Sequence, residues 1–444
     1  MNPLSRHEFA AALKKGQGRA LQQIIHFGIG DYKDLVIEAC LQDQNFDSQI
    51  DSSRAPWLFS MFQNTPFYTE FREAIFNGLK TSSSWDLAQQ CHLLREMALA
   101  GDTLARQRLK ETVFKYAAQD SEDEGIIAET FVDMQTAEEF LALARMYGNR
   151  LQEDATAFPN DVLIPEEKKQ EFKDLLYHYA KIDPLIQRYW QYLDERGILD
   201  DAPKTIDRDT ARKNWHERVR QEYTLDQILK DAQNKKGDLP GRYLTFGMHA
   251  TKEELDAIYA SLMAEKDPEV QIRLLWVFRR SALPEINDSI FQWANGPDVG
   301  LRETAIFSLS EIHDEKVHQL AKEKVKRGEL VGPDFKVISL FQHNYENPDA
   351  QLITTALYSI EASEEDTHSI GFDLIHLSKI QSDPDLSDAL KWVYEHTPCM
   401  NCRYQALLEL NNYNRVDEQV AQEIPFDAEP DIRTFAGKLR KVEH

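Results

Sequence analysis

A short pattern recurs along the C-terminal half of the chain. A small or acidic turn leads to an arginine, and the arginine begins an apolar run with helical spacing. The arginines of the four copies are Arg273, Arg302, Arg403 and Arg433. The first two are 29 residues apart and the last two are 30 residues apart. A fixed period of this size is typical of stacked helical hairpins, since one hairpin cannot bury its apolar face alone. The pattern therefore predicts an all-α superhelical solenoid of helical hairpins.

Local signals mark helix starts in both halves of the chain. Four hydroxyl residues precede apolar periodic runs and are followed, three residues on, by Glu or Gln, which is the spacing of a capping box. The pairs are Ser5 with Glu8, Thr136 with Glu139, Thr224 with Gln227 and Thr251 with Glu254. Because glycine is scarce, at 18 of 444 residues, we expect these runs to form an almost wholly helical chain.

The chain is too long for one ordinary core, so it must form several domains or one elongated array. The hairpin rhythm breaks between residues 152 and 222, where clusters of turn-forming residues flank an aromatic helical run. We therefore predict an N-terminal helical-hairpin array over 1–151, an irregular helical insertion or linker over 152–222, and a C-terminal repeat array over 223–444.

The fullest copy of the pattern spans residues 298–314, with Asp298 before the helix, Arg302 at its head and Ala305 three residues later. This copy resembles HEAT repeats, and especially the short HEAT-like repeats of phycobilisome lyases. The resemblance implies a HEAT/armadillo-like solenoid, in which Asp298 caps its helix and Arg302 ties adjacent repeats together. The N-terminal half shares only the general rhythm of such repeats. The copy at Arg403 departs from the pattern, because Cys399-Met-Asn-Cys402 replaces the acidic start.

The charge balance restricts the partners that the chain can hold. With 75 acidic and 51 basic residues the net charge is −24, which repels phosphate backbones and bilayer surfaces and favours basic partners. No apolar run approaches the length of about 18 residues that a membrane span needs. The N-terminus lacks a signal-peptide pattern, and four cysteines are too few for a disulfide framework in a chain of this length. We therefore expect a cytoplasmic protein without a nucleic-acid or membrane partner.

The pair Cys399 and Cys402, with His396 nearby, is the candidate metal site of the sequence. The two-residue spacing suits zinc or a redox pair. A structural zinc ion needs four ligands, however, and a redox pair normally belongs to a βαβ unit, which the pattern does not contain. Thr397 and Pro398 have the residue types of a helix N-cap and first helical position. We therefore expect buried structural thiols and no metal, with a metal site and redox chemistry as the alternatives.

A second candidate is a stripe of cations in the predicted insertion. Arg208, Arg212, His216 and Arg220 follow one another at intervals of four residues, so a helix would place them on one face. Such a stripe could hold an anionic partner or phosphates. The alternative is intramolecular pairing, because acidic residues are interleaved with these cations at Asp207, Asp209, Glu217 and Glu222.

No motif of an enzyme or cofactor site is present: there is no His-Glu-x-x-His, no Gly-x-Ser-x-Gly and no phosphate-binding glycine loop. We therefore expect no catalytic residues and no cofactor. The fold class favours a non-catalytic scaffold or adaptor that binds a protein partner through its solenoid surface. The alternatives are a HEAT-like enzyme acting on nucleic acid or a tetrapyrrole, as in the lyase and alkylpurine DNA glycosylase branches of that family, or a regulatory subunit that docks through residues 152–222.

Overall fold

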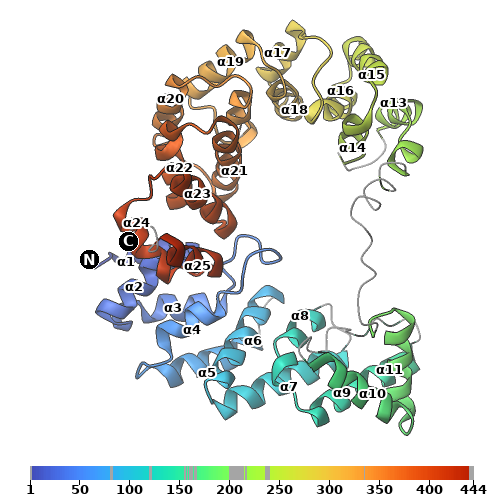
Figure 1. The fold of residues 1–444 in the computed structure, drawn as a ribbon, viewed down its shortest axis with the longest axis vertical. Helices are drawn as coiled ribbons and strands as arrows, with labels where there is room; N and C mark the ends of the chain where they lie inside the picture. The colour runs from blue at the N-terminus through green and yellow to red at the C-terminus, as the bar shows by residue number, and fades with distance from the viewer. Residues whose placement is uncertain are drawn as a thin grey trace. The chain divides into compact units, whose positions relative to one another are not determined.

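The chain is all-α, as the sequence predicts. The computed structural model describes residues 3–80, 84–119, 123–154, 157, 159, 164, 168–199, 215, 218–235, 241–334 and 336–439. Within these ranges the regular elements are α-helices and short 3₁₀ helices (η), and no β-strand occurs (Figure 1).

The contacts divide the chain into two compact units. Unit 1 contains residues 1–204 together with 418–444, and unit 2 contains residues 205–417. These units do not coincide with the three predicted segments. The helices at 169–195, in the predicted insertion, pack on the helix before them, and the last 27 residues of the predicted C-terminal array belong to unit 1.

Unit 1 is a succession of helices in which each packs on near neighbours in the sequence. Its elements are α1 (Arg6–Lys15), α2 (Gly18–Phe27), η1 (Gly30–Tyr32), α3 (Lys33–Leu41), α4 (Ala55–Phe62), α5 (Tyr68–Gly78), α6 (Ser84–Leu99), α7 (Thr103–Gln119), α8 (Glu124–Glu129), η2 (Val132–Met134), α9 (Ala137–Glu153), α10 (Lys169–Ala180), α11 (Pro184–Glu195), α24 (Glu418–Glu423), η8 (Ile424–Phe426) and α25 (Pro430–Leu439). The contacts run from α1 through α3, α6, α7 and α9 to α11. Neighbours therefore bury one another's apolar faces along the unit.

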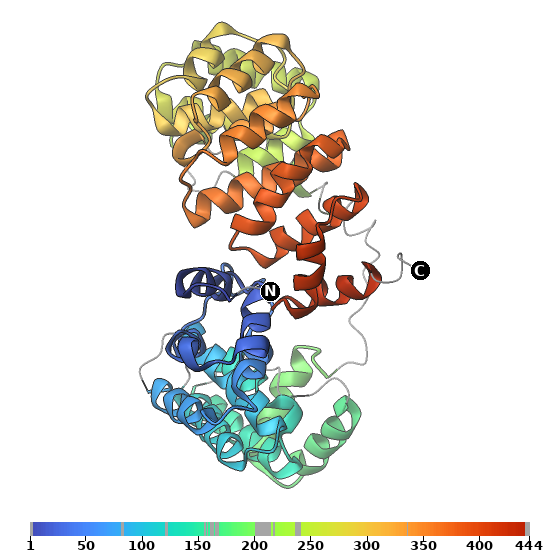
Figure 2. The same cartoon turned by 90° about the vertical axis from the view of Figure 1, so that its left-hand side faces the viewer.

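The end of the chain covers the beginning of unit 1. In Figures 1 and 2 the dark red C-terminal helices lie beside the blue N-terminal ones, and α24 and η8 contact α2. The indole N–H of Trp57 donates to the carbonyl of Phe426 at 2.8 Å, and the amide of Ala428 donates to the carbonyl of Gly16 at 2.9 Å. The approach is closest at Gly18, where an added Cβ would lie 2.2 Å from the carbonyl oxygen of Glu423.

Unit 2 contains a row of elements that pack one on the next. Its elements are α13 (Leu225–Gln233), α14 (Gly241–His249), α15 (Lys252–Ala264), α16 (Pro268–Leu275), η4 (Trp276–Arg279), α17 (Asp288–Ala294), α18 (Val299–Ser310), α19 (Glu315–Lys326), η5 (Gly332–Asp334), η6 (Val337–Phe341), α20 (Pro348–Leu357), α21 (Glu364–Gln381), η7 (Pro384–Leu386), α22 (Ser387–His396) and α23 (Met400–Asn412). The row consists of α16 with η4, then α18, η6, α21 and α23. Helices α15, α17, α19 and α22 pack against the row, and α20 joins α19 to α22.

The predicted helix starts form as local hydrogen-bond patterns. Complete capping boxes occur at Ser5, Thr136 and Thr251, where the hydroxyl and the glutamate three residues on each accept a backbone N–H. The hydroxyl of Thr224 accepts from the amide of Gln227, so this residue caps its helix as well. The carboxylate of Asp298 caps α18 by accepting from Leu301 at 2.9 Å.

Three cations pair with carboxylates that lie 30 to 38 residues later in the sequence. At α7, one oxygen of Asp102 accepts from the first-turn amides of Leu104 and Ala105, and the other oxygen accepts from Arg72 of α5 at 3.2 Å. Asp183 serves α11 in the same way, with its second oxygen 2.7 Å from Arg145 of α9. Arg302 lies 3.5 Å from Asp334 across the same kind of interval. In α7 and α11 one carboxylate thus both caps its helix and binds an arginine of an earlier helix.

Asp334 also neutralises a buried lysine. The ammonium group of Lys324 is 2.8 Å from Asp334 and 2.9 Å from Glu329, and only 2% of the Lys324 side chain is exposed. Removing one partner of a buried ion pair is strongly destabilising, since the remaining charge stays desolvated. Exposed pairs contribute little by comparison.

We predict that Gly18→Ala loosens the contact between the two ends of the chain. A helical glycine exposed to solvent normally tolerates alanine, and the change stabilises by about 0.5–1 kcal/mol. At Gly18 the methyl group meets backbone, so we expect a loss of about 1–3 kcal/mol instead. Hydrogen exchange of peptides covering α1, α2, α24 and α25 measures the effect. Gly125→Ala in α8, where an added Cβ meets nothing within 4 Å, is the control. Equal exchange in both variants would contradict the packing described.

We also predict that Asp334→Asn destabilises unit 2 by roughly 3 kcal/mol, because Lys324 then keeps only Glu329. Asp288→Asn is the matched control: Asp288 pairs with Lys316 at 3.1 Å, but 81% of the Asp288 side chain is exposed. Its loss should cost below about 1 kcal/mol. Local opening free energies of α18 and α19, measured by native-state hydrogen exchange, distinguish the two. Similar values for the two variants would show that the Lys324 charge is not desolvated.

Candidate functional site

The two cysteines of the Cys-x-x-Cys segment begin a helix. Cys399 is the N-cap of α23, and its sulfur accepts from the amide of Cys402 at 3.4 Å. The prediction that Thr397 caps this helix is therefore wrong, because the helix begins at Met400; Thr397 instead accepts from the amide of Cys399 at 3.3 Å. The sulfur of Cys399 therefore caps α23 as the carboxylate of Asp298 caps α18. Both cysteines are buried, with 6% of Cys399 and 4% of Cys402 exposed.

An imidazole from the neighbouring helix joins the two sulfurs. Nδ1 of His368, in α21, lies 3.5 Å from Sγ of Cys402. A donor atom of His368 and the two sulfurs all lie within 4.8 Å of one another. We call His368, Cys399 and Cys402 the thiol–imidazole cluster. It lies where α21 packs on α23, and His368 is half-buried while the sulfurs are buried.

His396, the histidine that sequence proximity suggests as a third ligand, is not part of this cluster. Its Nδ1 lies 2.9 Å from the carbonyl oxygen of Trp392, one turn earlier in α22. Its ring stacks on the Trp392 indole, with centroids 4.9 Å apart. His368 lies 34 residues before Cys402, which is about the interval that separates the cation–carboxylate pairs. A search of the sequence for a histidine at that interval before Cys402 would have identified His368.

Hydrogen bonds within the cluster shift the pKa values of Cys399 and His368 in opposite directions. A hydrogen bond from Cys402 lowers the pKa of Cys399, burial acts in the opposite direction, and a hydrogen bond from His368 lowers it further, to about 4. The hydrogen bond with Cys399 in turn raises the pKa of His368, against the effect of burial. The charge of Glu365 also raises the pKa of His368, and the charge of Lys336 lowers it. The other two cysteines differ, since burial alone raises the pKa of Cys91 to about 12 and raises that of Cys40 further.

A strip of aromatic and cationic side chains lies on the same row of elements. We call Trp276, Arg279, Phe307, Lys336 and Phe372 the cationic–aromatic strip. The guanidinium carbon of Arg279 is 4.5 Å from the ring centre of Trp276 and 3.9 Å from that of Phe307. The ammonium of Lys336 is 5.5 Å from the ring centre of Phe307 and 5.8 Å from that of Phe372. These contacts connect η4, α18, the start of η6 and α21.

The two cations of the strip are bound differently. Lys336 is paired with Asp373 at 3.0 Å, and burial raises the pKa of Asp373 to about 6. Arg279 forms no ion pair or hydrogen bond with any residue that the structure describes, and Glu303 and Asp373 act on it only from a distance. Its guanidinium is half-buried, and burial lowers its pKa. The N–H groups of a guanidinium held on two aromatic rings are therefore available to a ligand.

The predicted cationic stripe is only partly described. Arg208, Arg212 and His216 lie outside the described residues. Arg220 is engaged within unit 2: it forms a bidentate pair with Glu254, at 2.8 and 3.1 Å, and donates to the carbonyl of His249 at 3.2 Å. For Arg220 the structure therefore shows intramolecular pairing, the alternative to binding of an anionic partner.

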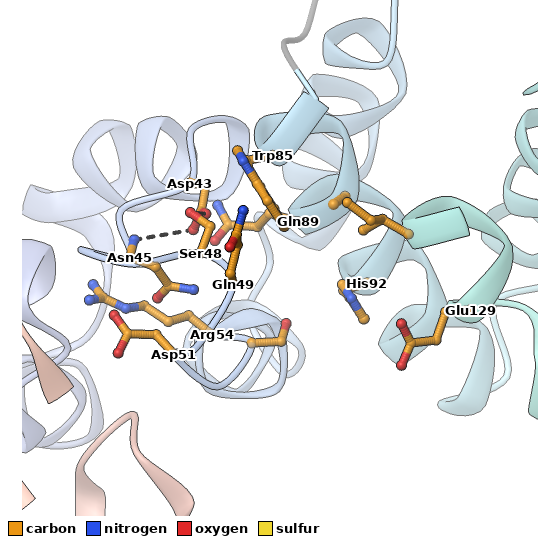
Figure 3. A pocket seen from close by; sticks show the side chains of 13 residues that line it. Asp43, Asn45, Ser48, Gln49, Asp51, Arg54, Trp85, Gln89, His92 and Glu129 are labelled. Carbon is orange, nitrogen blue, oxygen red and sulfur yellow. Dashed lines mark hydrogen bonds between the residues drawn. The ribbon is translucent and has the colours of Figure 1, made fainter. Parts of the chain in front are cut away.

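Unit 1 contains a polar cavity of about 460 Å³, which no sequence motif predicts. In Figure 3 the loop residues Asp43, Asn45 and Asp51 lie on one side of the cavity, and His92 and Glu129 lie on the other side. The carboxylates hold the loop itself, since Asp43 accepts from the amide of Asn45 at 3.2 Å and Asp51 accepts from the amide of Phe46 at 3.1 Å. Burial lowers the pKa of His92 to about 4, so its ring is neutral near pH 7. We therefore interpret the carboxylates of this cavity as groups that stabilise the loop and not as a ligand site.

No protein-family model matches the chain, and no curated protein matches it either. Among the described helices, none combines the length and the apolar character that crossing a bilayer requires.

We predict that reduced protein contains one cysteine thiolate near neutral pH. The far-ultraviolet absorbance of thiolate should titrate with a midpoint near the Cys399 pKa of about 4. Cys399→Ser should remove this transition, whereas Cys91→Ser should leave it unchanged because Cys91 stays protonated. A transition only near the ordinary thiol value of about 8.5 would show that His368 and the helix start do not stabilise the thiolate.

Proposed function

We propose that the protein is a non-catalytic scaffold or adaptor: an α-solenoid of HEAT-like helical hairpins that binds a protein partner on unit 2. Three observations support the solenoid. The arginine pattern repeats at 29 and 30 residues, successive elements of unit 2 pack in a row, and carboxylates at helix starts pair with arginines of the preceding hairpin. Arrays of this kind act through extended surfaces, because each repeat adds side chains to the same face.

The proposed position of the binding surface depends on one observation, which is the environment of the Arg279 guanidinium. Its guanidinium lies on the Trp276 and Phe307 rings, and it has no carboxylate partner among the described residues. Arginine and tryptophan are enriched among the residues that dominate binding energy at protein interfaces. Further along the strip, 60% of Phe372 is exposed, so an apolar contact is available beside the guanidinium.

The strip fits an acidic segment that also carries apolar side chains. A partner carboxylate would form a bidentate pair with Arg279, and an apolar side chain would cover Phe372. A polyphosphate backbone fits less well, because Glu303 and Asp373 place negative charge beside the same cations and the whole chain carries −24. The partner that fits this strip is therefore acidic, whereas the net charge alone favours basic partners.

Affinity purification from extract of the source cells tests the proposal, with four variants compared to the unaltered chain. Arg279→Glu and Phe372→Asp change the strip. Arg188→Glu and Ile182→Asp make the same kinds of change at exposed positions of unit 1, where 70% of Ile182 is exposed. Truncation of an interface hot spot costs at least about 2 kcal/mol, so recovery of the partner should fall roughly 30-fold with the first two variants only.

Two outcomes would overturn the proposal. One is equal recovery of the same proteins with all four variants, which would place the binding surface elsewhere. The other is recovery of nucleic acid, lost with Arg279→Glu, which would make the strip a phosphate-binding surface. Circular dichroism of each variant shows that a loss of recovery does not come from unfolding.

A further inference from the structure

One distance within the thiol–imidazole cluster matches that of two ligands that share one metal ion. Zinc–sulfur bonds are about 2.3 Å and zinc–nitrogen bonds about 2.0–2.1 Å, so at a tetrahedral angle the two ligand atoms stand about 3.5 Å apart. Sγ of Cys402 and Nδ1 of His368 are 3.5 Å apart. The sulfur of Cys399 completes a triangle whose members all lie within 4.8 Å. Three donor atoms are therefore gathered in one place, where a local rearrangement would let them share an ion.

The charges that face the cluster also allow a cation. A thiol must lose its proton to coordinate a metal ion, so binding would release protons. Other charges face the cluster as well: Glu365 acts on His368 as an anion, and Lys336 acts on it as a cation but is paired with Asp373. The local charge therefore does not repel a divalent ion strongly.

We propose that His368, Cys399 and Cys402 bind one zinc ion, with a fourth position left to water or to an external donor. Two sulfurs and an imidazole form a donor set that selects thiophilic ions such as zinc.

The same residues fit a redox dithiol less well. Reactive cysteines of that class are partly exposed, whereas only 6% and 4% of these two are exposed. The third donor also comes from a different helix, so the ion would connect α21 to α23, two neighbours of the row. A disulfide would connect only residues within the first turn of α23.

Cobalt and zinc titrations of the reduced, metal-free full-length chain test the site. Cobalt(II) should give the sulfur-to-cobalt charge-transfer absorbance and the intense visible bands of tetrahedral coordination, saturating at one equivalent. Zinc should then displace it. Competition with a chromophoric chelator gives the zinc affinity, and each ion bound should release protons that a weakly buffered titration detects.

Four variants assign the ligands. Cys399→Ser, Cys402→Ser and His368→Gln should each abolish stoichiometric binding. His396→Gln should bind as the unaltered chain does, because His396 is held by Trp392. The half-exposed position of His368 makes His368→Gln the variant least disturbing to folding, and circular dichroism of the metal-free forms checks this.

Three results would overturn the proposal. The first is the absence of stoichiometric cobalt or zinc binding by the reduced chain. The second is equal loss of binding with His396→Gln and His368→Gln. The third is octahedral cobalt, which would show that the sulfurs do not coordinate. If the reduced chain takes up no metal but forms a Cys399–Cys402 disulfide in air, the cluster is a redox pair instead.

Discussion

A carboxylate with two functions connects helices that are separate in the sequence. At the start of α7 and of α11, one oxygen of an aspartate caps the new helix and the other accepts a hydrogen bond from an arginine of an earlier helix. Such partly exposed pairs contribute about 0–1 kcal/mol each, so they do not supply most of the stability. Most of the stability comes from apolar faces, at about 25 cal/mol per Å² buried. The carboxylates help to select which faces meet, because these two pairs join residues 30 and 38 positions apart.

Sequence reasoning succeeds where the interaction is local. The capping boxes at Ser5, Thr136 and Thr251, the cap of Asp298 and the all-α class depend on residues within a few positions of one another, and the structure confirms them. It fails where the partner is remote. Arg19 pairs with Glu423 across 404 residues, and no local sequence pattern predicts this contact. The candidate metal site divides in the same way: Cys399 and Cys402 follow from their spacing, but His368 comes from α21, 34 residues before Cys402.

The thiol–imidazole cluster and the cationic–aromatic strip of unit 2 share one helix. His368 of the cluster and Phe372 of the strip are four residues apart on α21, so they project from the same face of that helix. Lys336 is near both: its charge acts on His368, and its ammonium is 5.8 Å from the Phe372 ring. The cluster and the strip are therefore neighbours on the surface of α21.

The placement of residues 418–444 in unit 1 has a consequence for biosynthesis. Domains generally fold as units as the chain leaves the ribosome, N-terminal part first. Here unit 1 lacks α24 and α25 until all of unit 2 has been synthesised. The surface around Gly18 and Trp57 therefore stays uncovered while residues 205–417 are made.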